Sequence, residues 1–217
     1  MAGMSFDMVM AYLYRLMPER DPELQQMETW AREHNFPILD PVSAQFCYQV
    51  TRLCGARRVF EMGSGYGYST AWFARAVQEN GGGEVHHTVL DERLSARAKH
   101  SLDALGYGAL MHYHIKNAVE ALQESDGPFD LIFNDIDKQQ YAGSLPVIAA
   151  KLRPGGVLLV DNLLWYGRIF NALDHEPATQ AVREFTLQVR NDPAWNASIV
   201  PIGDGLLMAI RNAEPAA

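Results

Sequence analysis

From Arg58 onward, short apolar runs alternate with helical stretches, and this alternation constrains the fold more than any other feature of the sequence. The apolar runs, each predicted to be a buried strand, are Val59–Met62, Val85–Leu90, Met111–Ile115, Phe129–Asn134 and Val157–Val160. The helical stretches between them are Ser69–Gln78, Glu92–Leu105, Ala118–Gln123 and Tyr141–Leu152. Such an alternation predicts a parallel sheet with helices on both faces.

Helices precede this alternation, and a hairpin ends it. The three N-terminal helical patterns, which prolines bound, are Phe6–Met17, Pro22–His34 and Pro41–Leu53. A last helix, Ala178–Asn191, leads to two apolar runs, Ala197–Ile202 and Leu206–Ile210, separated by Gly-Asp-Gly. Two such runs around a glycine turn predict a β-hairpin. The expected fold is therefore a Rossmann-like, doubly wound α/β sheet of seven strands that ends in an antiparallel hairpin.

Composition and charge are those of an ordinary soluble globular protein, with 48% hydrophobic and 20% charged residues. The formal net charge of −8 argues against a general nucleic-acid binder, which needs a basic face to meet phosphates. No apolar run approaches the roughly 20 residues that span a bilayer, and Met1–Arg15 makes a poor signal peptide. We expect a cytoplasmic protein with one domain over residues 1–217, in which helices of residues 1–57 cover a site on the α/β core of residues 58–211.

The first predicted strand runs directly into a glycine loop, Gly63-Ser64-Gly65-Tyr66-Gly67-Tyr68-Ser69. Glycines at this place let the backbone approach a ligand closely, and the N-terminus of the next helix favours nearby negative charge. The glycines are one residue closer than in the dinucleotide fingerprint, and no Gly-Lys-Ser/Thr follows, so neither a dinucleotide site nor a P-loop is indicated. Glu61, just before the loop, suits a ligand with an ammonium or sulfonium group. The alternative is a tight turn without a ligand.

Carboxylate and amide side chains end two later strands. Asp135 follows the fourth strand, and Asp161 and Asn162 follow the fifth. If these strands are neighbours, about 4.8 Å apart, the side chains meet at the carboxyl edge, where open α/β sheets bind ligands. An all-oxygen set suits Mg²⁺, or Mn²⁺ or Ca²⁺, rather than zinc, and Lys138 is close enough in sequence to remove a proton from a hydroxyl held there. The alternative is aspartates that only cap the following helices.

The histidines of the predicted strands do not indicate a second site. His112 and His114 share one face of the third strand, as a metal pair would, but no third ligand lies at a matching spacing. His86 and His87 point to opposite faces of the second strand. We therefore expect His112 and His114 to be half-exposed histidines on the sheet, and His86 and His87 indicate no site.

Together, these motifs resemble those of one enzyme family. The strings Glu61-x-Gly63-x-x-x-Gly67-x-Ser69, Asp135-Ile136-Asp137-Lys138-x-x-Tyr141 and Asp161-Asn162-x-Leu164-Trp165-x-Gly167 look like the cation-dependent class I O-methyltransferases of the catechol and caffeoyl-CoA type, which use S-adenosylmethionine. The string Pro201-Ile202-Gly203-Asp204-Gly205-Leu206 resembles the closing hairpin of that family, and the similarity covers roughly residues 35–211.

The resemblance implies a role for each motif residue. It implies that the metal is held by Asp135, Asp161 and Asn162, with Lys138 as the general base. It implies a cofactor site made by Glu61, Gly63, Gly65, Gly67, Ser69, Asp91, Ala118, Asp135 and Asp137, and a substrate mouth lined by Trp165, Tyr166 and Arg168. A homodimer that methylates a hydroxyl of a small aromatic vicinal diol, catechol-like or hydroxycinnamoyl-type, is also implied.

Two positions depart from the pattern of the family. Val89 stands where the family usually carries an acid that holds the cofactor ribose; Asp91 takes that role if the loop shifts, or the ribose is held otherwise. Residues 41–45 read Pro-Val-Ser-Ala-Gln where the family often has Pro-Glu-Glu-Gly-Gln. Two alternatives therefore stay beside the methyltransferase: an NAD-dependent oxidoreductase, which the glycine spacing and the hairpin disfavour, and a non-catalytic protein that binds S-adenosylmethionine.

Overall fold

A computed structural model describes residues 5–213; residues 1–4 and 214–217 of the predicted 1–217 domain lie outside that range. Seven strands form one sheet in the order β3-β2-β1-β4-β5-β7-β6. The strands are β1 (Arg58–Met62), β2 (Glu84–Val89), β3 (Met111–Ile115), β4 (Phe129–Asn134), β5 (Leu152–Val160), β6 (Trp195–Val200) and β7 (Leu206–Arg211). The first five are parallel, whereas β7 pairs antiparallel with β5 and β6. The predicted doubly wound sheet with a terminal antiparallel hairpin is confirmed.

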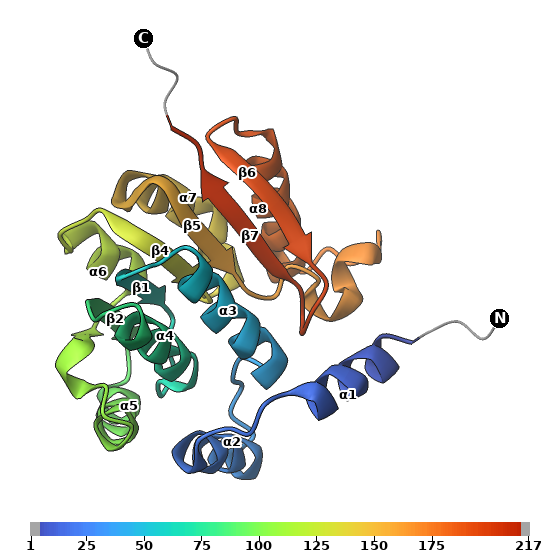
Figure 1. Cartoon of the computed structure of the whole chain (residues 1–217). Helices are drawn as coiled ribbons and strands as arrows, with labels where there is room; N and C mark the ends of the chain where they lie inside the picture. Colours follow the sequence, from blue (N-terminus) through green and yellow to red (C-terminus); the bar gives the residue numbers. More distant parts are fainter. Residues whose placement is uncertain (1–4, 214–217) are drawn as a thin grey trace.

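Helices lie on both faces of the sheet (Figure 1). They are α1 (Phe6–Leu16), α2 (Pro22–His34), α3 (Pro41–Leu53), α4 (Tyr68–Glu79), α5 (Glu92–Ala104), α6 (Ala118–Glu124), α7 (Tyr141–Lys151) and α8 (Pro177–Asn191). One buried apolar cluster joins a sheet face to α2, α3, α4 and α5, and a second joins the opposite face to α6, α7 and α8. Burial of both faces explains why the strands of this parallel sheet read as continuous apolar runs.

Two strands, β5 and β6, begin more than one residue earlier than predicted. The sequence predicts that β5 begins at Val157, because Arg153-Pro154-Gly155-Gly156 is typical of a turn, yet the strand extends back to Leu152 with a register shift against β4. Arg153 Nε donates to Asp130 Oδ1 at 2.7 Å and holds the irregular part of β5 against β4. Similarly, β6 begins at Trp195, before the predicted Ala197. The carboxyl end of β5 is unaffected by this difference.

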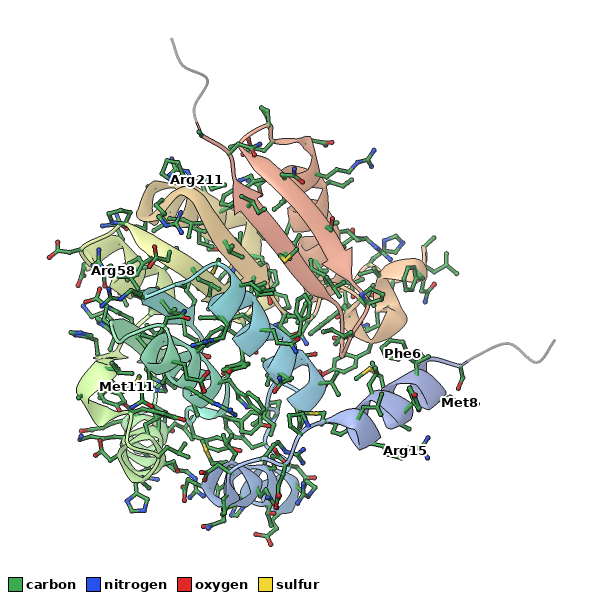
Figure 2. All side chains as sticks on the ribbon, in the orientation of Figure 1. Phe6, Met8, Arg15, Arg58, Met111 and Arg211 are labelled. Carbon is green, nitrogen blue, oxygen red and sulfur yellow. The ribbon has the colours of Figure 1, made fainter. Side chains whose placement is uncertain are left out.

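The helix α1 lies at one end of the molecule, apart from the sheet (Figures 1 and 2). All of its residues are exposed or half-buried, and its exposed side chains include Phe6, Met8, Tyr12 and Leu16. An amphipathic helix normally buries its apolar face against another surface. Across residues 5–213, the helices are too short or too polar to cross a membrane.

Candidate active site

The glycine loop connects β1 to α4 and is fastened to β2. Ser64 N donates to the Thr88 carbonyl oxygen at 2.8 Å, and Thr88 N donates to Ser64 Oγ at 2.9 Å. Gly63 N donates to Thr88 Oγ1 at 3.1 Å. These bonds fix the loop at the carboxyl edge of the sheet, with Ser69 buried in the first turn of α4.

The three loop glycines have conformations and surroundings that other residues do not tolerate. Gly63, Gly65 and Gly67 have φ values of 87°, 51° and 92°, which glycine adopts at little cost. A Cβ atom on Gly63 would lie 2.5 Å from the carbonyl oxygen of Asp135, and one on Gly67 would lie 2.8 Å from Ala98 Cβ. Internal packing therefore explains two of these glycines without a ligand, which the sequence-based argument did not anticipate.

Glu61 lies in β1 beneath the loop and is fully buried. The Thr70 hydroxyl donates to Glu61 Oε2, whereas Glu61 Oε1 is buried without a hydrogen-bond partner among the described residues. Burial raises the pKa of Glu61 to about 7, although the surrounding loop hydroxyls lower it. A buried carboxylate oxygen without a partner fits a cationic ligand group.

The substitution Glu61→Gln is expected to flatten the pH dependence of stability in cofactor-free protein. Because burial raises the pKa from 4.5 to about 7, the folded state keeps a proton that the unfolded chain releases in this window. The stability that this proton contributes is fully present below the unfolded pKa and is lost as the pH rises through the folded pKa. In total, the free energy of unfolding falls by about 3 kcal/mol. Urea unfolding of the wild type and of Glu61→Gln at about pH 5 and about pH 7.5 measures this change. If the free energy of unfolding fell equally in the two proteins between these pH values, the expectation would be contradicted.

Asp135 and Asp161 leave adjacent parallel strands at the same level, as predicted. The residues that precede them, Asn134 and Val160, are register partners in β4 and β5. Burial raises the pKa of both carboxyls, and the neighbouring Asp135 raises that of Asp161 further. Asp161 Oδ1 is buried and has no hydrogen-bond partner in residues 5–213.

Lys138 is the cation beside this pair. Its Nζ donates to Asp135 Oδ1 at 2.8 Å and to the Ile136 carbonyl oxygen at 3.2 Å, and the residue is only 9% exposed. Its charge lowers the pKa of Asp135 against the effect of burial. The same Nζ lies 5.0 Å from the ring centroid of Tyr141 and 5.8 Å from that of Trp165. The ammonium of Lys138 thus contacts Asp135 and lies near the rings of Tyr141 and Trp165.

Asp204, in the turn of the β6–β7 hairpin, joins this edge although sequence reasoning did not assign it to the site. Because β7 runs antiparallel to β5, with Leu207 opposite Val160, the turn lies beside the carboxyl end of β5. Asp204 Oδ2 accepts a hydrogen bond from Asn162 Nδ2 at 3.2 Å, and Asp204 Oδ1 accepts one from Tyr166 N at 2.6 Å. Burial raises the pKa of Asp204. The order of the strands, rather than a local motif, would have identified it.

The segment after β5 has an unusual backbone. Asn162, Trp165 and Tyr166 have φ values of 63°, 46° and 52°, in a left-handed region that non-glycine residues rarely occupy and that is concentrated at functional sites. The rings of Trp165 and Tyr166 lie 5.6 Å apart, and Tyr166 is 75% exposed.

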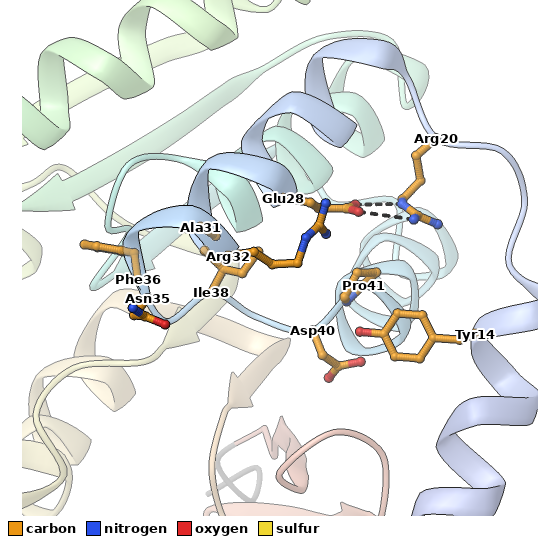
Figure 3. A pocket seen from close by; sticks show the side chains of 10 residues that line it. All are labelled: Tyr14, Arg20, Glu28, Ala31, Arg32, Asn35, Phe36, Ile38, Asp40 and Pro41. Carbon is orange, nitrogen blue, oxygen red and sulfur yellow. Dashed lines mark hydrogen bonds and ion pairs between the residues drawn. The ribbon is translucent and has the colours of Figure 1, made fainter.

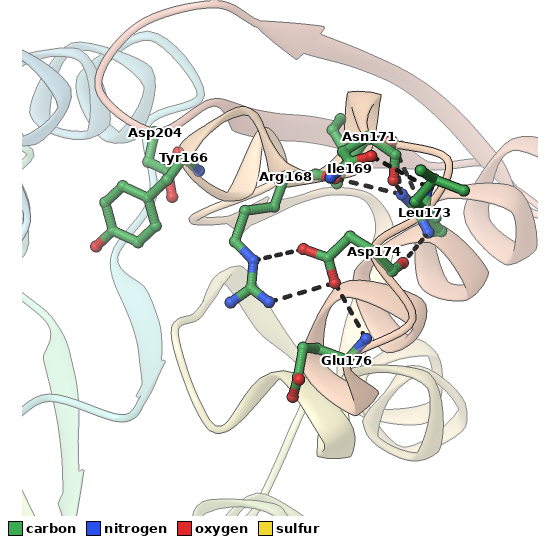
Figure 4. A network of polar contacts seen from close by, with 9 residues as sticks. Tyr166, Arg168, Ile169, Asn171, Leu173, Asp174, Glu176 and Asp204 are labelled. Atoms are coloured by element: carbon green, nitrogen blue, oxygen red, sulfur yellow. Dashed lines mark hydrogen bonds and ion pairs between the residues drawn. The ribbon is translucent and has the colours of Figure 1, made fainter.

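Arg168 forms an ion pair with Asp174 within the same segment (Figure 4). Arg168 Nε lies 2.7 Å from Asp174 Oδ2, and Arg168 Nη2 lies 3.2 Å from Asp174 Oδ1. Arg183 of α8 donates to the carbonyl oxygens of Arg168, Ile169 and Asn171. In this structure the guanidinium of Arg168 therefore fixes the shape of the segment.

The remaining predicted cofactor residues begin helices along the same edge. Asp91 caps α5, and Asp137 caps the short helix Lys138–Gln140, each by accepting a backbone N–H. Ala118 is the first residue of α6, after β3. Val89, which replaces the expected acid, is the last residue of β2. The fold therefore brings these residues to the edge that carries the glycine loop.

A pocket of about 570 Å³ opens beside the glycine loop (Figure 3). Its lining residues, which come from α1, α2, the segments on either side of α2 and the start of α3, are Tyr14, Arg20, Glu28, Ala31, Arg32, Asn35, Phe36, Ile38, Asp40 and Pro41. A ring carbon of Phe36 lies 3.3 Å from the Cβ position of Gly65, and Asp40 contacts the corresponding position of Gly203 in the hairpin turn. The pocket thus adjoins both the glycine loop and the hairpin.

Comparison with known proteins shows relatives over most of the chain. Residues 19–212 match the family model described as O-methyltransferase. A catechol O-methyltransferase of Niastella koreensis is 29% identical over 216 residues, which cover 94% of this chain and 97% of that protein. The O-methyltransferase from Bacillus cereus, solved in complex with SAH, has 26% identity and a TM-score of 0.85, with 94% of this chain and 97% of that chain covered. A methyltransferase from Geobacter sulfurreducens has 26% identity and a TM-score of 0.83, with coverages of 98% and 100%.

These similarities agree with the seven-stranded sheet, its terminal hairpin and the glycine loop. They do not favour the NAD-dependent alternative, and the resemblance inferred from the motifs is confirmed. The chain belongs to the O-methyltransferase family and is an S-adenosylmethionine-dependent O-methyltransferase.

Proposed function

We propose that this enzyme methylates one hydroxyl of a small aromatic vicinal diol, catechol-like or hydroxycinnamoyl-type, with the help of a divalent cation. The observation that carries the proposal is the pair of carboxyls at the ends of adjacent strands, half-buried Asp135 and buried Asp161. Asp161 Oδ1, which lacks a hydrogen-bond partner among the described residues, and the amide of Asn162 complete a set of oxygen donors that fits Mg²⁺, or Mn²⁺ or Ca²⁺. The related catechol O-methyltransferase supports the choice of acceptor.

S-adenosylmethionine, in this proposal, binds along the carboxyl edge and supplies the sulfonium methyl group. Its contacts come from the loop and helix starts described above: Glu61, Gly63, Gly65, Gly67, Ser69, Asp91, Ala118, Asp135 and Asp137. The buried Oε1 of Glu61, without a hydrogen-bond partner in the described part of the chain, suits the ammonium of the methionine end. Asp91, exposed as the cap of α5, replaces the acid missing at Val89 as the ribose ligand.

The chain itself supplies a base and a positioned acceptor. A divalent cation, when bound, lowers the pKa of a hydroxyl that it contacts. If Asp135 held the cation, its ion pair with Lys138 would be broken; Lys138 would then release its proton to solvent and, as the neutral amine, would be placed to accept the hydroxyl proton at Nζ. Trp165 covers one side of Lys138 and limits the access of water. Holding the acceptor oxygen in line with the methyl group supplies much of the remaining rate.

Trp165, Tyr166 and Arg168 form the substrate mouth in this proposal. The exposed ring of Tyr166 offers a flat apolar surface to an aromatic acceptor, and Asp204 fixes its backbone. Arg168 shapes the mouth through its ion pair with Asp174.

The test is methyl transfer from S-adenosylmethionine to catechol-type acceptors, measured with and without a chelator. We expect activity that a chelator removes and added Mg²⁺ restores. Activity that does not respond to chelation would exclude the cation, whereas binding of S-adenosylmethionine without turnover of any diol would exclude this class of acceptor.

We also propose that the protein is a homodimer in which α1 contributes to the interface. The exposed apolar side chains of α1, among them Met8 and Leu16, favour burial against a second copy. Analytical ultracentrifugation is expected to give twice the chain mass of 24.3 kDa, and Met8→Asp to shift the protein toward monomer, whereas Asp7→Ala on the same helix serves as the control. A wild-type monomer would contradict the proposal.

A further inference from the structure

A cluster of histidines and one glutamate lies on β2 and β3, outside the active site. His86 and His112 are register partners, and their stacked rings lie 4.7 Å apart. Glu84 is on the same face of β2, with Oε1 3.4 Å from His86 Nε2 and Oε2 3.8 Å from His112 Nε2. Two of these three groups lie on β2 and His114 is not among them, so spacing along β3 alone could not reveal the cluster.

This cluster lies at the other edge of the sheet from the glycine loop. Glu84 is the first residue of β2, and His112 is near the start of β3, so both are at the amino ends of their strands. Within residues 5–213, Glu84, His86 and His112 are the one set of three carboxylate, imidazole or thiolate groups whose ligand atoms all lie within 4.8 Å of one another.

The distances match those between ligands of one transition-metal ion. Bonds of about 2.0–2.1 Å in tetrahedral geometry place two ligand atoms about 3.4 Å apart. The His86 Nε2 to Glu84 Oε1 distance equals this value, and the His112 Nε2 to Glu84 Oε2 distance needs only a small adjustment. Mixed imidazole and carboxylate donors suit Zn²⁺ rather than Mg²⁺.

His86 has the surroundings of a metal ligand. It is 7% exposed, and its Nε2 is buried without a hydrogen-bond partner among the described residues. Its Nδ1 lies 2.9 Å from His114 Nε2, so that a metal on Nε2 leaves the Nδ1 proton to be donated to His114, the outer contact that orients a ligating histidine. Burial, with His112 and His114 nearby, lowers the pKa of His86 to about 4, which keeps the ring neutral for ligation.

One cation stands beside the cluster. Arg58 Nε donates to Glu84 Oε1 at 2.7 Å, and the same guanidinium donates to the carbonyl oxygens of Asp126 and Pro128. It orients the carboxylate but competes with a metal for Oε1, the oxygen measured against His86 Nε2, and its charge weakens metal binding relative to a site without a cation. A hollow of about 500 Å³ beside Arg58 and Glu84, together with the half-exposed ring of His112, gives the site access to solvent.

We propose that Glu84, His86 and His112 form a second metal site, which binds Zn²⁺ or a similar transition ion through the carboxylate and the two Nε2 atoms. His114 orients His86, and solvent completes the coordination. The site joins the edge strand β3 to β2 and is independent of methyl transfer.

The experiment is calorimetric titration of untagged protein with Zn²⁺ in the presence of excess Mg²⁺, supported by the visible spectrum of the Co²⁺ form. We expect one Zn²⁺ per chain, a visible spectrum typical of nitrogen and oxygen ligands, and a rise in melting temperature. His112→Ala is expected to weaken binding at least tenfold and to remove the rise; because His112 is half-exposed, this variant keeps the fold. His100→Ala, an exposed histidine of α5, is the matched control and should bind as the wild type does.

The variant Asp161→Ala distinguishes the two proposed metal sites, because it changes the Mg²⁺ site at the carboxyl ends of the strands and leaves Glu84, His86 and His112 intact. Unchanged Zn²⁺ binding in this variant supports the proposal. Zn²⁺ binding that Asp161→Ala removes and His112→Ala retains would overturn it, as would the absence of binding to the wild type.

Discussion

Asp161→Ala is expected to lower kcat/KM for a catechol-type acceptor by about a thousandfold and to leave the protein folded. Loss of one oriented charged or polar group from a dry catalytic site costs about this factor, and here the group is also a proposed cation ligand. The fold survives because the structural contacts of Asp161 are made by its backbone: its N–H donates to the Asn134 carbonyl oxygen, and its own carbonyl oxygen accepts from Tyr141. Initial rates and thermal melting measure the two effects.

The substitution also removes a buried carboxyl that is costly to ionise, since burial raises the pKa of Asp161 well above its ordinary value. The cation-free variant is therefore expected to melt at or above the wild-type temperature at neutral pH. Asp126→Ala, an exposed aspartate before β4 whose carbonyl oxygen still binds Arg58, is the control and should keep full activity. Wild-type activity in Asp161→Ala that still responds to a chelator would place the cation elsewhere.

Lys138→Met is expected to lower kcat by about a hundredfold to ten-thousandfold, the range for loss of a general base. Methionine keeps the buried stem beside Tyr141 and Trp165 and removes the amine. Because the proposed general base is removed, the rate of the variant should rise steadily with pH as solvent hydroxide replaces the amine. The measurement is kcat against pH with saturating S-adenosylmethionine.

The control for Lys138 is Lys151→Met, since Lys151 is a half-buried lysine that donates to the Ser125 carbonyl oxygen, away from the site. It should keep the wild-type pH profile. Lys138→Met also removes the ion-pair partner of Asp135. The pKa of Asp135 is therefore expected to rise further in this variant, because the ammonium that lowers it is gone. If Lys138→Met lost cofactor or cation binding and kept the wild-type dependence of kcat on pH, Lys138 would be a positioning residue.

Most of the fold could be predicted because helices and buried strands leave different periodicities. The bounds of α2, α3, β3 and β4 agree with the prediction, since prolines, caps and abrupt changes of polarity mark them. The start of β5 could not be predicted, because Pro154 and two glycines dominate the local pattern, whereas pairing with β4 and the Arg153–Asp130 ion pair decide the outcome.

The candidate site also contains residues that could be predicted from the sequence and residues that could not. Asp135 and Asp161 could be placed together because consecutive parallel strands are commonly neighbours. Asp204 and the Glu84–His86–His112 cluster could not, because each depends on which strand lies beside which and in what register. The need for glycine at position 63 could not be predicted either, because the atom that a Cβ would meet is the carbonyl oxygen of Asp135, just after β4.

The hairpin turn has a consequence for the order in which this enzyme is completed during translation. Asp204 is translated 42 residues after Asn162, yet it accepts a hydrogen bond from the side chain of Asn162 and another from the backbone N–H of Tyr166. Its strand β7 lies between β5 and β6 rather than at the border of the sheet. A nascent chain that has already emerged with its glycine loop therefore still lacks the contacts that hold the segment after β5. We therefore expect the segment after β5 to take its final shape only when β7 has been inserted between β5 and β6, and a chain shortened before the turn to lack these contacts.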